Sequence, residues 1–157
     1  MIKLYSDGAC SGNPGPGAYG AILNNGEQKF TFCKSYILTT NNRMELLGII
    51  EPIESLDTLE TIEIYTDSQY VANALNKKWL ENWVKNNWLK SDKKKVLNID
   101  LWKRLLKLLE KHKIKINWIK GHGTNEMNNR CDRMATAAII SQSPTHDEIY
   151  EKSKLGE

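Results

Sequence analysis

The stretch TIEIYTDSQYV (residues 61–71) changes from a strand pattern to a helix pattern at one acidic residue. Its first half is a short run rich in β-branched residues, which predicts a buried strand that ends at Asp67. A helix pattern, SQYVANAL, begins directly afterwards at Ser68. In such a βα arrangement, ligands gather beyond the carboxyl end of the strand. We therefore predict an α/β fold with a ligand site beside Asp67.

Upstream of this unit, the sequence predicts three antiparallel strands. The run IKLYS (residues 2–6) alternates in polarity and predicts a strand that ends at Asp7. Residues 12–17 (GNPGPG) should form a tight loop, because each proline fixes φ and lacks an N–H. Residues 18–37 predict a hairpin whose two strands are joined by NNG, with glycine where a positive φ is needed.

Downstream, the pattern predicts helices and further strand. TTNNRMELLGIIEPIESL (residues 39–56) predicts a helix that is capped by Thr40 or Asn41 and kinked or shortened by Pro52. Two more helices and a fifth strand are predicted over residues 98–113, 125–142 and 115–120, respectively. The expected architecture is a five-stranded mixed sheet, with its first three strands antiparallel and helices on both faces.

The length and composition are those of one globular domain. A chain of 157 residues can bury a full core, and 40% hydrophobic with 26% charged residues is ordinary for such a domain. We take residues 1–143 as the domain and expect residues 144–157, which lack a core-forming pattern, to be a flexible C-terminal tail. The apolar stretches are too short for a membrane span, and three scattered cysteines fit neither a disulfide framework nor a zinc site. We expect a cytoplasmic monomer with no membrane partner.

Charge is unevenly distributed along the chain. Residues 1–76 hold four Lys or Arg against nine Asp or Glu, whereas residues 77–120 hold fourteen against four. An acidic half joined to a basic stretch favours metal chemistry on a polyanion. A solvated basic helix face is the alternative interpretation of the basic stretch.

Four acidic residues lie at the edges of predicted elements, and each is close to glycine, asparagine or serine. They are Asp7, Glu45, Asp67 and Asp132. Alone, each of them is explained by turn or capping duty. Brought together, four carboxylates repel one another strongly unless cations lie between them, and Mg²⁺ is the usual cation for oxygen ligands in phosphoryl chemistry.

The blocks that carry these acids resemble type 1 ribonuclease H. DGACSGNPGPGAYGAIL, TTNNRMELLGII, IYTDSQYV, NIDLW and IKGHG…NRCDRMA occur in the family's order, with similar spacing, from about residue 3 to about residue 140. The resemblance implies a ribonuclease H-like fold and Mg²⁺-dependent endonucleolytic cleavage of the RNA strand of RNA–DNA hybrids, which leaves 5′-phosphate and 3′-hydroxyl products. Two Mg²⁺ ions, or Mn²⁺ in their place, are implied as cofactors.

The resemblance also assigns roles to individual residues. Asp7, Glu45, Asp67 and Asp132 match the family's metal-binding catalytic acids, and His122 matches its catalytic-loop histidine. Amide side chains that sense a ribose 2′-hydroxyl are implied at Asn13, Asn41, Asn42 and Gln69. Thr40 and Asn98 match positions that hold a DNA phosphate. Turn and cap duty is the alternative for Asn13 and Asn41, and an ion pair is the alternative to substrate contact for Arg43.

The basic segment of about residues 77–98 resembles the family's protruding handle. Trp79 and Trp83 are four residues apart, so on a helix they share a face, and Lys85 lies among the surrounding lysines. Aromatic residues interleaved with lysines suit contact with a nucleic-acid strand. Tryptophans that anchor a small helical subdomain are the alternative. We interpret Trp102 and Trp118 as packing residues.

One departure concerns the loop that carries His122. Asn129 occupies a position where the family commonly has an acid, and GTNEMNN (residues 123–129) lacks the usual histidine and proline. Two other functions remain open: a non-catalytic hybrid-binding module, and a DNA strand-transfer or resolvase-type nuclease with a similar acidic fold. The acidic set disfavours the first, and the asparagine and glutamine set disfavours the second.

Overall fold

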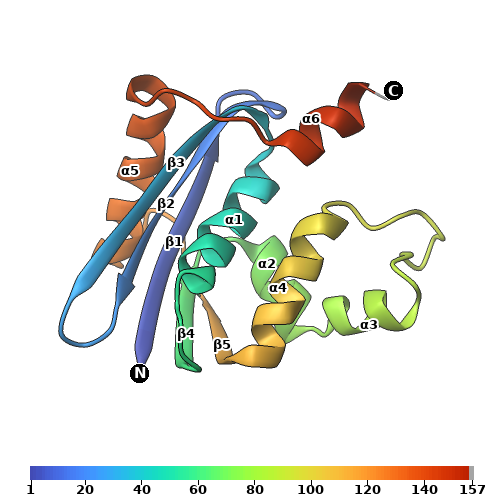
Figure 1. The fold of residues 1–157 in the computed structure, drawn as a ribbon, viewed down its shortest axis with the longest axis horizontal. Coiled ribbons are helices and arrows are strands. Elements are labelled where there is room, and N and C mark those ends of the chain that lie inside the picture. Colours follow the sequence, from blue (N-terminus) through green and yellow to red (C-terminus); the bar gives the residue numbers. More distant parts are fainter. Residues whose placement is uncertain (156–157) are drawn as a thin grey trace.

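A five-stranded mixed sheet forms the centre of the computed structural model, which describes residues 1–155 (Figure 1). The strands are β1 (Ile2–Cys10), β2 (Gly15–Asn24), β3 (Lys29–Thr39), β4 (Thr61–Thr66) and β5 (Lys113–Trp118). Their order is β3-β2-β1-β4-β5; the first three pair antiparallel, and β4 pairs parallel with both β1 and β5. This arrangement confirms the predicted sheet.

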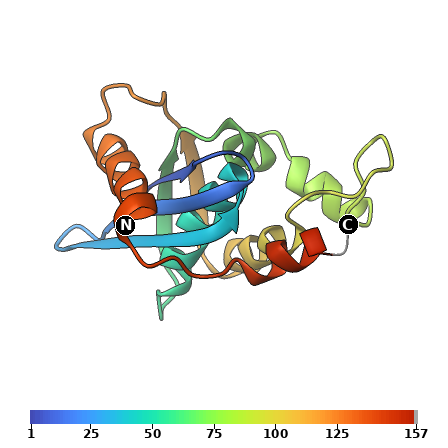
Figure 2. The ribbon, with the colours of Figure 1, turned by 90° about the horizontal axis from the view of Figure 1, so that it is seen from above.

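Helices cover both faces of this sheet, as predicted. They are α1 (Asn41–Glu54), α2 (Gln69–Asn76), α3 (Trp79–Lys85), α4 (Ile99–Lys111), α5 (Glu126–Ser141) and α6 (Glu148–Leu155). Helices α1 and α4 lie on one face, and α5 packs on β1, β2 and β3 from the other (Figures 1 and 2). Within residues 1–155, no helix combines the length and the apolar character needed to cross a membrane.

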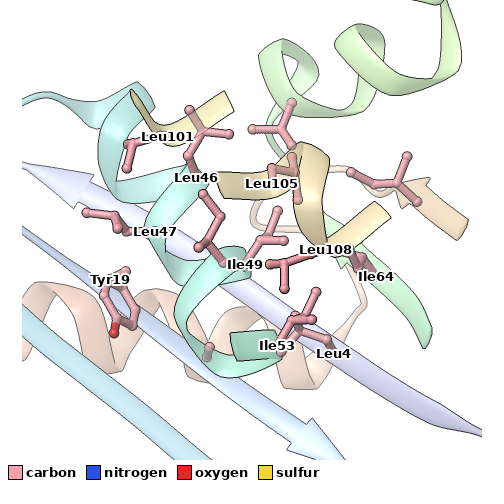
Figure 3. Packing of buried hydrophobic residues seen from close by; sticks show 14 of the residues in the cluster. Leu4, Tyr19, Leu46, Leu47, Ile49, Ile53, Ile64, Leu101, Leu105 and Leu108 are labelled. Atoms are coloured by element: carbon pink, nitrogen blue, oxygen red, sulfur yellow. The ribbon is translucent and has the colours of Figure 1, made fainter. Parts of the chain in front are cut away.

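The core lies between α1, α4 and the sheet (Figure 3). Leu46 and Ile49 of α1 meet Leu105 of α4, while Leu4 and Ile64 face them from the strands. All five side chains are fully buried. Because burying an aliphatic side chain contributes roughly 1.5–3 kcal/mol, this layer holds α1 rigidly against the sheet.

Helix α1 begins where the sequence predicted, and Pro52 does not shorten it. Thr40 is its N-cap and accepts a hydrogen bond from the Arg43 backbone nitrogen. Pro52 lies inside the helix, which continues to Glu54. A proline removes a single N–H donor, and the burial of Pro52 and of Ile53 beside it favours continuation of the helix.

Two boundaries near Asp7 differ from the prediction. Strand β1 continues past Asp7 to Cys10, and β2 begins at Gly15, inside the predicted loop. Asp7 pairs with Gly20, and the ladder runs on to Cys10 and Gly17. At Gly17 and Gly20 a Cβ would lie within 2.6 Å of atoms from other elements, so glycine lets neighbouring segments approach β2 here.

Residues 144–155 of the expected tail lie against the sheet and include a helix. Thr145 bridges to Tyr36 of β3 and exchanges backbone hydrogen bonds with Ser35 and Ile37, and α6 follows. Asp147 is buried. Polar contacts hold this segment in place. Its sequence therefore has no apolar periodicity from which its packing could have been predicted. Residues 156–157 of the expected tail lie outside the described residues.

Candidate active site

The sheet and α1 bring three acids to one place. The parallel ladder between β1 and β4 ends with the pair Tyr5–Tyr65, and two residues later come Asp7, still in β1, and Asp67, directly after β4. Glu45 lies in α1, which crosses β1 at Gly8. A Cβ on Gly8 would lie 2.7 Å from the Glu45 backbone nitrogen, so only glycine permits this close approach.

The three carboxylates lie close enough to share a ligand. Asp7, Glu45 and Asp67 each offer one oxygen, and these oxygens all lie within 4.8 Å of one another. Asp7 and Glu45 are only 5% and 4% exposed. Asp7 Oδ1 accepts a hydrogen bond from the Gly8 N–H at 3.0 Å, whereas Glu45 Oε2 is buried with no protein partner in the described part of the chain.

This crowding makes ionisation unfavourable. Burial, followed by the negative charge of Asp67 and the Asp132 carboxyl, raises the pKa of Asp7 to about 8. Burial and the charges of Asp7 and Asp67 raise the pKa of Glu45 well above its usual range. A cation among these oxygens would relieve both effects, because it would replace repulsion by attraction.

Asp132 and His122 complete the acidic site from the other side. Asp132 projects from α5, and its Oδ2 lies 3.9 Å from Nδ1 of His122. The His122 side chain is 84% exposed, in a turn with φ 54°. A Cβ on Gly121 would lie 2.6 Å from Asp67 Oδ2, so this turn passes directly over the carboxylate. The Asn129 amide donates to the Gly123 carbonyl at 3.0 Å and ties the turn to α5.

A cavity of about 440 Å³ opens at this cluster. Eight of the predicted site residues line it: Asp7, Asn41, Asn42, Glu45, Asp67, Gln69, His122 and Asp132. A larger hollow, of about 570 Å³, lies near Met1, Phe30 and Leu56, and Glu27 and Glu60 are the charged side chains in its lining. The smaller cavity is therefore the candidate active site, because it alone among the described cavities contains the acidic cluster.

Three further predicted substrate residues, Asn13, Thr40 and Asn98, lie outside the cavity lining. Asn13 Oδ1 accepts the Asn41 backbone N–H at 3.1 Å, and Thr40 caps α1. Both therefore perform the structural duty that the sequence left open. Asn98 precedes α4 with φ 61°, and its amide donates to the Tyr70 hydroxyl at 3.2 Å.

The predicted handle projects away from the sheet, with α3 and the loop that follows it at the edge of the molecule (Figure 1). Trp79 is 37% exposed and Lys85 is exposed. Trp83 packs edge-on against the buried Trp102, with ring centroids 5.4 Å apart. Trp83 therefore anchors the handle, as the alternative interpretation foresaw, and Trp79 and Lys85 present its outer surface.

Trp118 was interpreted wrongly as a packing residue. It is 47% exposed, and its indole N–H donates to the Asp67 carbonyl at 3.0 Å. Its position at the last residue of β5 explains the exposure. Tyr70, which the sequence did not single out, lines the cavity and accepts hydrogen bonds from Asn98 and Trp102. Only its place directly after Gln69 could have indicated it.

Comparison with known proteins places the chain in a family. The model of the RNase H family matches residues 1–140. This chain belongs to the ribonuclease H family. Ribonuclease H of Proteus mirabilis (strain HI4320) is 48% identical over 148 residues, which cover 94% of this chain and 91% of that protein. Ribonuclease H of Desulforamulus reducens (strain ATCC BAA-1160 / DSM 100696 / MI-1) is 49% identical over 137 residues, or 87% and 86% of the two chains.

A solved structure agrees with this assignment. The crystal structure of LC9-RNase H1, described as a type 1 RNase H with the type 2 active-site motif, superposes with a TM-score of 0.79 at 25% identity. The match covers 90% of this chain and 73% of that one. The chain is therefore a type 1 ribonuclease H, and the family predicted from the sequence blocks is confirmed.

Proposed function

We propose that this ribonuclease H cleaves the RNA strand of RNA–DNA hybrids internally, with two Mg²⁺ ions held by its acidic cluster. The observation that carries the proposal is the convergence of Asp7, Glu45 and Asp67 in a partly buried cavity. Family membership supports the activity and a divalent metal. The choice of Mg²⁺, and the use of two ions, rest on the chemistry of the donor set.

The residues fit such ions. All the donors are hard carboxylate oxygens, and the orphaned Glu45 Oε2 needs a partner that no described side chain supplies. Asp7, Glu45 and Asp67 would hold one ion, and Asp7 with Asp132 would hold the second. When bound, two ions activate a water for in-line attack on the phosphate and stabilise the leaving 3′ oxygen. Mn²⁺ offers the same coordination chemistry.

His122 is suited to moving protons at the edge of this site. Its exposed ring can turn toward solvent, and Asp132 lies 3.9 Å from its Nδ1. The residue can therefore accept a proton near the scissile phosphate and release it to water as the product departs. The flanking glycines permit that movement, and Asn129 limits it through its bond to Gly123.

The side chains around the acids suit recognition of a hybrid. Asn41, Asn42 and Gln69 line the cavity with amides that both donate and accept hydrogen bonds, as sensing a 2′-hydroxyl requires. Asn13 fixes the backbone of Asn41, because its side-chain oxygen accepts a hydrogen bond from the Asn41 N–H. We propose that these amides contact the RNA strand across the minor groove.

Contacts with the DNA strand would lie farther from the acids. We propose that Thr40 and Asn98 hold one phosphate, and that the handle makes further contacts with the DNA strand. Trp79 and Lys85 are the exposed residues that would stack and pair with the strand, while Trp83 supports them.

Asp7→Asn tests the proposal directly. The variant should lose cleavage of a labelled hybrid in Mg²⁺ while hybrid binding, measured by fluorescence anisotropy, remains largely intact. Wild-type protein in EDTA is the matched control. Full activity of Asp7→Asn would rule out the metal site, and equal degradation of single-stranded RNA would rule out hybrid specificity.

The choice of substrate distinguishes the proposed function from that of a DNA strand-transfer or resolvase-type nuclease. Such an enzyme would cut duplex or branched DNA under the same conditions. We expect none of this activity, because the amides that line the cavity suit hydrogen bonds to a 2′-hydroxyl, which DNA lacks. A monomer in the cytoplasm remains our prediction, and size-exclusion chromatography with light scattering tests its first half.

A further inference from the structure

The C-terminal segment reaches a buried arginine at the start of α1. Asp147, which directly precedes α6, accepts from Arg43 Nε through Oδ2 at 2.7 Å and from Nη2 through Oδ1 at 2.9 Å. The Thr39 hydroxyl donates to the same Oδ2 at 2.7 Å. Asp147 and Arg43 are 6% and 3% exposed. This bidentate pair fixes residue 147 where β3 gives way to α1.

Arg43 also holds the start of α4. Its Nη1 and Nη2 donate to the two oxygens of Asp100 at 2.9 and 2.7 Å. The Tyr150 ring of α6 lies 5.7 Å from the guanidinium carbon. Helices α1, α4 and α6 thus meet at one guanidinium, and α6 lies beyond the ends at which α1 and α4 begin (Figure 1).

Arg43 contacts two side chains proposed to hold a phosphate, Asn98 through its guanidinium and Thr40 through its backbone N–H. Arg43 Nη1 lies 3.4 Å from Asn98 Oδ1, and the Arg43 backbone N–H donates to the Thr40 hydroxyl. The other end of Asn98 donates to Tyr70, directly after Gln69. Asn98 has a positive φ of 61°, in the left-handed region that asparagine adopts more readily than other non-glycine residues, and this backbone conformation places its side chain between Arg43 and Tyr70.

We propose that Asp147 is a positioning residue for hybrid binding, acting through the Arg43 guanidinium on Asn98. This inference rests on the proposed function. Without Asp147, the guanidinium loses two of these four carboxylate bonds and keeps only the two to Asp100, so it is less firmly held. Asn98 Oδ1 then loses the fixed position of its guanidinium partner. The acids lie outside this chain of contacts, so substrate affinity changes and the chemical step does not.

Asp147→Asn tests the inference, because it keeps the shape of the side chain and removes its charge. We expect KM for a hybrid to rise about tenfold, the value of one hydrogen bond to a charged group, with kcat changed by less than about twofold. Assays are run below the melting temperature, with the folded fraction verified by circular dichroism. Glu151→Gln is the matched control, because it breaks the exposed pair with His146 in the same segment and leaves Arg43 untouched.

A double-mutant cycle distinguishes positioning from a general loss of stability. In an Asn98→Ala background, Asp147→Asn should add less than about twofold to KM, because the contact through which it acts is already gone. Should Asp147→Asn fail to fold, Arg43→Lys gives a second test, since it retains the charge and lacks the planar fork. We expect the same rise in KM.

The outcomes separate this inference from the proposed function. An unchanged KM in a folded Asp147→Asn or Arg43→Lys variant overturns the inference, as does a full additive effect with Asn98→Ala. A wild-type protein that does not cleave hybrids in Mg²⁺ overturns the proposed function instead.

Discussion

Asp7→Asn should stabilise the metal-free protein at neutral pH, although it abolishes the proposed activity. Asp7 is 5% exposed and lies among other carboxylates. Its folded-state pKa is about 8, against an ordinary value of 3.8. At neutral pH without metal, the folded protein must either hold a proton on this group or bear its charge. Asparagine does neither.

The direction of the pH dependence follows from proton binding. Between pH 3.8 and about 8, the folded state retains the Asp7 proton that the unfolded chain releases. Raising the pH across this window therefore favours unfolding. The stability that the neutral carboxyl allows is fully present below pH 4 and is lost as the pH approaches 8. Glu45 acts in the same direction, because its pKa is also raised.

The expected gain in the free energy of unfolding is smaller than the full pKa shift implies, because the neighbouring acids share the bound proton. A pKa that moves from 3.8 to about 8 corresponds to at most about 6 kcal/mol, since each pKa unit is worth about 1.4 kcal/mol. Part of the repulsion is relieved by small movements and by protonation of Glu45 instead. We therefore expect about 2–3 kcal/mol at pH 8. For a chain of this size, this raises Tm by about 5–10 °C.

Thermal melts in EDTA from pH 4 to pH 8.5 measure the effect. The Tm gap between Asp7→Asn and wild type should be near zero at pH 4 and should widen steadily above it. Asp57→Asn, which removes an exposed acid, should show no such widening. Added Mg²⁺ should narrow the gap, because cations bind the wild-type cluster better. A gap of equal size at both ends of the pH range would refute the electrostatic argument.

Three further changes test the handle, the histidine turn and the core. Replacing Lys93–Lys95 with alanine should raise KM and reduce the steepness of its salt dependence, because exposed lysines contribute counterion release; an unchanged salt slope would show that the handle does not touch the hybrid. Gly121→Ala should lower kcat by about tenfold or more in steady-state assays, since its Cβ would lie 2.6 Å from Asp67 Oδ2; normal kcat would mean that the turn moves freely. Trp102→Ala should destabilise the protein by about 3–5 kcal/mol in urea titrations, because the indole is fully buried; a loss below about 1 kcal/mol would mean that the neighbouring residues collapse into the space.

Local patterns predicted the sheet and the cluster well, because both depend on short-range rules. Strand TIEIYT ends at Thr66, directly before Asp67, because the apolar alternation stops there, and Thr40 caps α1 through its own hydroxyl. Once β1 and β4 pair in parallel, Asp7 and Asp67 meet without any further information. Glu45 follows from the close approach that Gly8 permits.

The C-terminal segment could not be predicted in this way. Asp147 and Arg43 are 104 residues apart in sequence, and neither lies in a periodic pattern that points to the other. The pair forms because a guanidinium buried at the start of α1 needs more than one carboxylate. The prediction for Trp118 failed for a related reason. The sequence around it in β5 has the pattern of a core strand, but Trp118 is the last residue of an edge strand and few residues pack against it.

The core packing of α1 holds Glu45 in the acidic cluster, where its charge is unfavourable. Ten of the fourteen residues of α1 are buried, and one of them is Glu45, whose ionisation burial opposes. A helix held less firmly could move Glu45 away from Asp7 and relieve the repulsion. The packing of Leu46 and Ile49 against Leu105 prevents this movement. The apolar contacts therefore keep the carboxylates together in the absence of metal. The site is preorganised for cations, and the metal-free protein is less stable as a result.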